Sequence, residues 1–146
     1  MAIYHLSAQV ISAGVGKSAV AAAAYRHAAR MVSGSTGLIV SYEGKAGVVH
    51  TELTLPPDTP AWFRTGIDGR DTAGASEFLW NAVERKEGVR GTGLAMEMNI
   101  ALPVELTREQ NIALVRDWIE EHGRAAVFAR KGTRRTRPRR PMTRRP

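Results

Sequence analysis

A phenol, a carboxylate, an amide and an imidazole in this sequence could act together in one reaction. They belong to Tyr25, Glu97, Asn99 and His5. Such a set could bind a metal-bridged phosphodiester, with the phenol oxygen attacking phosphorus in a transesterification. Composition alone favours a plainer interpretation, in which Tyr25 is a half-buried packing residue and Glu97 is an ordinary solvated one.

The alanine-dense run from Ser18 to Met31 predicts the helix that would carry Tyr25. Alanine is the best helix former, and the Ser18 hydroxyl can accept a hydrogen bond from an orphan backbone N–H as an N-cap. The run contains no Leu, Ile or Phe. Its small side chains could therefore let the helix approach a sheet closely while burying little apolar area. His27 lies two residues past Tyr25, about 200° round the helix, and is expected to face elsewhere.

Two stretches with a period of two predict the strands that would face this helix. The first covers residues 3–10 and has His5 on its polar face. The second covers residues 94–102, and one of its faces is wholly apolar. Its other face carries Glu97 and Asn99 and would normally face water. The alanines that flank these two residues would leave room there for a helix or a ligand.

The rest of the body predicts further elements around these strands. A hairpin is expected over residues 38–55, followed by a surface loop over residues 56–74 that is rich in Pro, Gly and Asp. Ser76 is expected to cap a second helix, and Thr107-Arg-Glu-Gln110 has the spacing of a capping box. A third helix should run from that box to about residue 122. We therefore predict an α+β fold, an antiparallel β-sheet flanked by helices.

A Gly-Lys-Ser sequence at residues 16–18 superficially suggests a phosphate-binding P-loop. That motif needs a glycine five residues before its Gly-Lys, and Ile11 stands there. No apolar strand that ends in Asp follows to hold magnesium. Nucleotide binding is therefore not predicted.

Charge divides the chain into two parts. Residues 1–122 carry 11 Lys and Arg against 14 Asp and Glu, whereas residues 123–146 carry ten Lys and Arg and no acid. We expect the first part to be the domain and the second to be a disordered Arg/Pro-rich tail that attracts phosphates through counterion release. The alternative is a tail without a biological role. The absence of Cys, of a long apolar run and of a signal-peptide pattern favours a cytoplasmic protein without a membrane span.

Five separated blocks of the sequence agree, in order and approximate spacing, with one known family. They are Met1–Ser7, Gly16–Arg26, Gly47–Glu52, Leu79–Glu84 and Glu97–Thr107. Together they resemble the MobA/MobL family of plasmid mobilisation relaxases. The resemblance implies an HUH-type fold and the nicking of single-stranded DNA at a transfer origin, with a tyrosine becoming bonded to the 5′ phosphate. It also implies that single-stranded DNA and other mobilisation proteins are the partners.

The same resemblance implies roles for individual residues. Tyr25 falls at the position of the nucleophile, and Glu97 matches an acidic position near the metal site. Asn99 lies where some members have a second acid, whereas His5 is expected to be structural and His50 solvated. We expect DNA contacts from basic residues near the nucleophile and along the tail: Arg26, Lys17, Arg134, Arg135, Arg137, Arg139 and Arg140.

One feature of the family is missing from this sequence. In the family, the helix that ends near His122 is followed by a strand with a His-x-His pair, which binds the Mg or Mn ion that polarises the scissile phosphate. This chain has no histidine after His122 and no His-x-His pair anywhere. We therefore predict that this copy binds no metal and is a truncated or frame-shifted product, incomplete at its C-terminal end. A nicking relaxase, a non-catalytic nucleic-acid-binding accessory protein and an inert fragment remain open.

Overall fold

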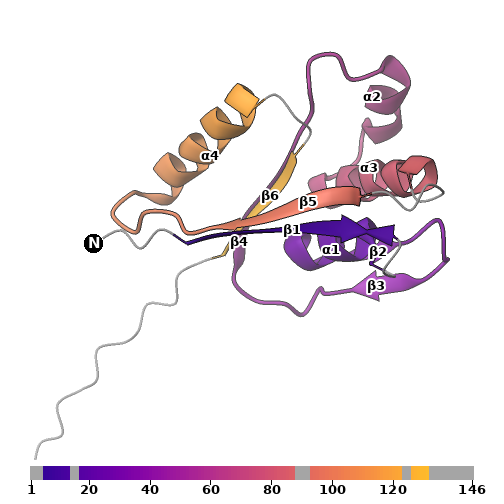
Figure 1. Ribbon diagram of the computed structural model, residues 1–146, viewed down its shortest axis with the longest axis horizontal. Coiled ribbons are helices and arrows are strands. Elements are labelled where there is room, and N and C mark those ends of the chain that lie inside the picture. Colours follow the sequence, from indigo (N-terminus) through magenta and orange to yellow (C-terminus); the bar gives the residue numbers. More distant parts are fainter. Residues whose placement is uncertain (1–4, 14–16, 88–92, 123–125, 132–146) are drawn as a thin grey trace, which may run out of the picture.

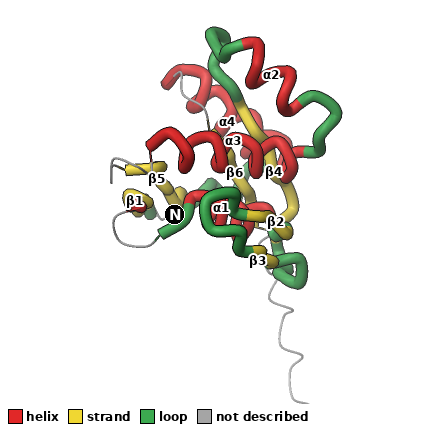
Figure 2. Tube along the Cα trace, turned by 90° about the vertical axis from the view of Figure 1, so that its right-hand side faces the viewer, coloured by secondary structure: helices red, strands yellow, loops and turns green. Residues whose placement is uncertain are grey.

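The computed structural model describes residues 5–13, 17–87, 93–122 and 126–131. Its elements are helices and antiparallel strand pairs, so the predicted α+β class is confirmed. Helices α1 (Ala19–His27) and α3 (Thr72–Glu87) lie side by side behind the ribbon formed by strands β1 (Leu6–Ser12) and β5 (Gly93–Ile100) (Figures 1 and 2). No helix among the described residues is long and apolar enough to cross a membrane.

Strands β1 and β5 form the antiparallel pair that was expected to face the alanine helix. Their register joins Leu6 to Ile100 and Gln9 to Glu97. The polar face of β5 turns towards the helices and not towards water, which agrees with the alternative in which the alanines beside Glu97 leave room for a helix. The apolar face is exposed: Leu6, Val10, Met96, Met98 and Ile100 all keep more than a third of their surface. An alternating sequence pattern identifies the two faces of a strand, but it does not tell which face is covered by helices.

Helix α1 begins as predicted and ends earlier than predicted. The Ser18 Oγ accepts a hydrogen bond from the Ala21 N–H at 3.1 Å, which confirms the N-cap. Ala28 then adopts a left-handed conformation, and strand β2 (Arg30–Val32) follows where the helix was expected to continue to Met31. Val20, Ala23, Ala24 and Met31 form a small core cluster.

The hairpin expected over residues 38–55 is wrong. Strands β3 (Ile39–Ser41) and β4 (Val48–Thr54) lie in that segment but do not pair with each other. Strand β3 pairs with β2, and β4 pairs with β6 (Ala126–Lys131). Alternation predicts that a segment is a strand, whereas its partner is decided by contacts distant in sequence.

Strand β6 also corrects the start of the expected tail. Residues 126–131 lie in the part that was expected to be disordered from residue 123 onwards, and they form a strand instead. The sequence Ala-Val-Phe-Ala has the β-branched and aromatic residues that favour strands. The surrounding arginines hid that signal. The tail arginines from Arg134 to Arg140 lie outside the described residues.

The loop expected over residues 56–74 contains helix α2 (Ala61–Ile67) and the first turn of α3. Phe63 is buried, and its ring centroid lies 5.3 Å from that of Phe78. The neighbouring Trp62 is exposed. Ser76 is fully buried inside α3 and does not cap it. The Asp71 side chain accepts from the Gly74 N–H at 2.7 Å and satisfies that end of the helix.

The third predicted helix is confirmed as α4 (Arg108–His122). Its capping box forms in both directions. The Gln110 N–H donates to Thr107 Oγ1 at 3.2 Å, and the Thr107 N–H donates to Gln110 Oε1 at 2.9 Å.

Candidate active site

Tyr25 lies in the last turn of α1, and the position of this helix is fixed from its other end. The Glu84 carboxylate of α3 accepts hydrogen bonds from the Ser18 Oγ at 2.8 Å and from the Val20 N–H at 3.2 Å. Glu84 is buried, and Ser35 Oγ donates to its second oxygen. A negative charge at a helix N-terminus also interacts favourably with the helix dipole. Helix α3 therefore holds α1, and through it Tyr25, in one place.

The Tyr25 ring is surrounded by an aromatic ring and two cations. Tyr42 meets it edge-on, with 5.3 Å between the ring centroids and 88° between the planes. The Lys45 Nζ lies 3.5 Å from the Tyr25 ring centroid, and the Arg26 guanidinium carbon lies 5.6 Å from it. Tyr25 keeps 39% of its surface exposed. The side chain is therefore both held and accessible.

Glu97 is connected to the surroundings of the Tyr25 ring by an interaction with Arg26. The two side chains form an ion pair that joins α1 to β5, and both are only partly exposed. Glu97 therefore lies on the face of β5 that turns towards the alanine helix, and not on a face exposed to water. Its carboxylate contacts a cation of the helix, and we call Tyr25, Arg26, Tyr42, Lys45 and Glu97 together the tyrosine site.

Other residues expected near Tyr25 lie in different surroundings. Lys17 is exposed just before the Ser18 N-cap, and about 9 Å of helix, from Ala19 to Tyr25, lies between it and the tyrosine. His27 is buried on the core side of α1, facing away from Tyr25 as expected. Asn99 shares the polar face of β5 with Glu97, and exposed His5 accepts a main-chain hydrogen bond from Ala101.

Sequence reasoning missed Tyr42 and Lys45. The turn-like sequence from Glu43 to Gly47 indicated a change of direction but gave no reason to connect it with Tyr25. The contact depends on how the β3–β4 connection folds back on α1. No local pattern carries that information.

The described residues do not gather ligands for a metal ion. Among them, no group of three or more His, Asp and Glu side chains lies close enough to hold one. The Glu97 carboxylate is also engaged by the Arg26 guanidinium, which competes for the same oxygen atoms. The donors around Tyr25 therefore do not fit a divalent cation in this arrangement, and no step is assigned to one.

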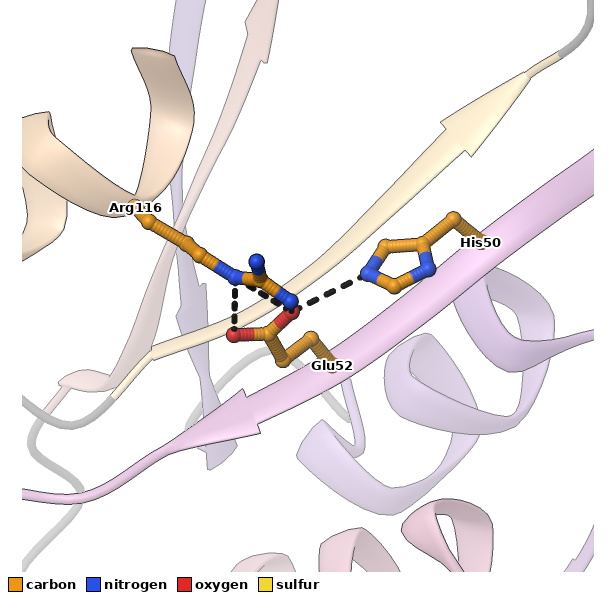
Figure 3. Close-up of polar contacts among 3 residues, drawn as sticks. All are labelled: His50, Glu52 and Arg116. Carbon is orange, nitrogen blue, oxygen red and sulfur yellow. Dashed lines mark hydrogen bonds and ion pairs between the residues drawn. The ribbon is translucent and has the colours of Figure 1, made fainter. Parts of the chain in front are cut away.

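A second polar cluster joins α4 to β4 (Figure 3). The Arg116 Nε donates to both Glu52 oxygens at 2.9 and 3.0 Å, and its Nη2 donates to Oε2 at 2.7 Å. His50 Nε2 lies 3.0 Å from the same Oε2, so this histidine is not simply solvated as expected. Hydrogen bonding from Arg116 is the main cause that lowers the pKa of Glu52. The cluster therefore connects α4 to β4 and stabilises their packing.

Comparisons with known proteins agree with the fold and with the expected family. A family model described as "MobA/MobL family" matches residues 17–131. The "Conjugal transfer protein TraA" of Rhizobium radiobacter is 48% identical over 122 residues, which cover 84% of this chain and 11% of that protein. The "Mobilization protein MobL" of Acidithiobacillus ferridurans is 45% identical over 114 residues, which cover 78% of this chain and 27% of that protein. The chain therefore spans only a small part of these relatives.

A solved structure described as "Molecular Basis of Vancomycin Resistance Transfer in Staphylococcus aureus" contains a chain of similar fold. Its TM-score is 0.69 and its sequence identity is 24%, and the match covers 88% of this chain and 70% of that chain. At this identity the similarity concerns the fold.

Proposed function

We propose, from the fact that the chain belongs to the MobA/MobL family, that it is a relaxase-type module of plasmid mobilisation. In this proposal it binds single-stranded DNA at a transfer origin and presents the Tyr25 hydroxyl to a phosphodiester bond. The names of the TraA and MobL relatives, which refer to conjugal transfer and mobilisation, support a role in plasmid mobilisation. The observation that carries the site is an accessible tyrosine ring with two cations beside it. Plasmid DNA lies in the cytoplasm, where this proposal places the chain.

The reaction at Tyr25 would be a transesterification. The phenol oxygen attacks phosphorus and gives up its proton, while the bond between phosphorus and the 3′ oxygen breaks and that oxygen gains a proton. The 5′ phosphate is left bonded to Tyr25, and the other DNA end is a 3′ hydroxyl. Arg26 and Lys45 would stabilise the added negative charge at phosphorus. Glu97 would act through Arg26, by holding the guanidinium beside the tyrosine ring.

The proposal also concerns the metal. When bound, Mg or Mn supplies positive charge at the scissile phosphate in this kind of chemistry. We expect this chain alone to bind neither ion tightly, because its sequence holds no His-x-His pair and Glu97 is paired with Arg26. Addition of about 1 mM Mn should leave the thermal unfolding midpoint unchanged, since only a ligand that binds the folded state raises it. A rise of several degrees would contradict this part of the proposal.

Oligonucleotide binding and cleavage test the proposal directly. We expect tighter binding to a single-stranded transfer-origin oligonucleotide than to its duplex, and weaker single-strand binding by Arg26→Gln, measured by fluorescence anisotropy. Equal affinity for both forms would contradict a relaxase-type module.

A cleavage assay tests the role of Tyr25 as nucleophile separately from the metal requirement. With Mg or Mn added, we expect this chain alone to give no nicked product. A nicked product with protein attached to its 5′ end, absent in Tyr25→Phe, would confirm the nucleophile and refute the metal proposal. If no nicked product forms, as expected, other mobilisation proteins are the partners to add, because in this proposal they supply the metal ligands.

A second candidate function rests on the basic tail. Ten cations without an acid in residues 123–146 attract any nucleic acid through counterion release. Removal of residues 132–146 keeps β6 and tests this candidate. If single-strand and duplex affinities both fall to the same low level, residues 132–146 are the nucleic-acid-binding element, as this candidate requires.

A further inference from the structure

Tyr25 has little on its own helix to hold its ring. The residues three and four positions before it, whose side chains would normally contact it, are Ala22 and Ala21. A tyrosine in the last turn of a helix, with only methyl groups on the preceding turn, would sample more than one rotamer. Its ring must be fixed by another part of the chain.

The β3–β4 connection supplies the ring contacts. The Tyr42 N–H donates to the Ala29 carbonyl at 3.1 Å, which attaches this connection to the chain just after α1. The Lys45 N–H donates to the Tyr42 carbonyl at 2.8 Å, and this turn brings both side chains to the same spot. Tyr42 then meets the Tyr25 ring edge-on, an arrangement that aromatic pairs prefer.

Lys45 makes two contacts with the same residue. Its Nζ donates to the Tyr25 backbone carbonyl at 2.6 Å and lies 3.5 Å from the Tyr25 ring centroid. The first contact satisfies a carbonyl at the C-terminal end of α1, where a cation interacts favourably with the helix dipole. The second is a cation–π contact. One ammonium group thus fixes both the backbone and the ring of Tyr25.

We propose that Tyr42 and Lys45 are positioning residues that hold Tyr25 in a single orientation for its phosphodiester partner. The inference rests on the proposed function of Tyr25. Holding a nucleophile before its partner arrives lowers the entropy that the reaction must otherwise lose. The same contacts keep a positive charge next to the ring, where a phosphate would bind.

Nuclear magnetic resonance of the tyrosine rings tests this proposal without DNA or metal. In the native chain we expect nuclear Overhauser contacts between the Tyr25 and Tyr42 rings and one set of Tyr25 β-proton couplings. Lys45→Met should abolish the contacts between the rings, and both Lys45→Met and Tyr42→Leu should average the Tyr25 couplings. Lys45→Arg and Tyr42→Phe should retain them, because a cation or a ring edge remains.

Lys86→Met is the matched control, since Lys86 is exposed in the last turn of α3. It should leave the Tyr25 signals unchanged. Amide spectra away from α1 identify any variant that fails to fold. An ordered Tyr25 ring in both Lys45→Met and Tyr42→Leu, with those amide spectra native, would overturn the proposal.

Adding a single-stranded oligonucleotide distinguishes this inference from the proposed function. We expect the Tyr25 ring signals to shift on binding in the native chain and to shift less in Lys45→Met. If the native Tyr25 signals do not respond to saturating oligonucleotide, the proposed function fails, while the free-chain spectra still decide whether Tyr42 and Lys45 hold the ring.

Discussion

His27 is a buried imidazole at the end of the alanine-rich helix α1. Only 8% of its surface is exposed, and neither ring nitrogen has a hydrogen-bond partner among the described residues. Burial lowers the pKa of His27 from its ordinary value, and the negative charge of Asp71 opposes this only in part. The imidazole is therefore neutral in the folded chain at neutral pH.

This burial predicts a pH dependence of stability. The contribution of His27 is fully present above its unfolded pKa of about 6.5, and it is lost as the pH falls towards the lowered folded value, because the unfolded chain then binds the extra proton. His27→Leu should flatten the fall of the urea midpoint between pH 7 and 5. His5→Gln, which changes an exposed histidine, is the control. An unchanged slope in His27→Leu would contradict the prediction.

Ala28 occupies a backbone conformation that suits glycine better. Its φ is 52° and its ψ is 46°. Its N–H donates to the Ala24 and Tyr25 carbonyl oxygens at the end of α1. Ala28→Gly removes the clash of Cβ in this region, so we expect it to stabilise the fold by about 0.5–1 kcal/mol after the added freedom of the unfolded chain is counted. Ala22→Gly, inside the same helix, should instead destabilise it by about 1 kcal/mol. Urea denaturation of both variants measures the difference.

At the scale of elements, α4 is attached to β4 by the ion pair of Arg116 with Glu52. The pair is partly exposed and is therefore screened by salt. A double-mutant cycle with Arg116→Gln and Glu52→Gln should give a favourable coupling free energy that shrinks from about 0.05 M to about 1 M salt. Because the folded pKa of Glu52 is lowered, the coupling is present above about pH 4.5 and is lost as the pH falls through the folded value.

Arg108→Gln serves as the control for that cycle, because it removes an exposed cation from the same helix. It should show no coupling to Glu52→Gln. A coupling of the same size for both arginines would mean that the measurement reports the net charge of α4 and not the pair.

The predictable part of the fold consists of elements with a local cause. The Ser18 cap, the Thr107 capping box and the β5 alternation each follow from residues within one or two turns of each other. The pairing of β4 with β6 and the left-handed Ala28 do not. The strand pairing depends on contacts that form only when distant segments meet, and Ala28 stands where a left-handed helix end usually has the glycine that would mark it in the sequence. For the same reason, the sequence indicated Tyr25 and Glu97 but not the Tyr42 and Lys45 beside the tyrosine ring.

At the scale of the whole molecule, the β1–β5 ribbon has one apolar face without cover among the described residues. Met96 and Met98 on this face are 66% and 39% exposed, whereas Met31 in the core is 1% exposed. Mild peroxide should therefore oxidise Met96 and Met98 about tenfold faster than Met31, as measured by peptide mass spectrometry. Equal rates for the three methionines in the folded chain would contradict this exposed face.

The same ribbon sets an order of events during synthesis. Strand β1 is made first, but its described partner β5 is complete only when residue 100 has been added. A chain leaving the ribosome must therefore carry β1, with its exposed Leu6 and Val10, unpaired until β5 has been made. Closing this contact late also loses more chain entropy than joining neighbouring strands, so refolding should be slow compared with helical proteins of this length.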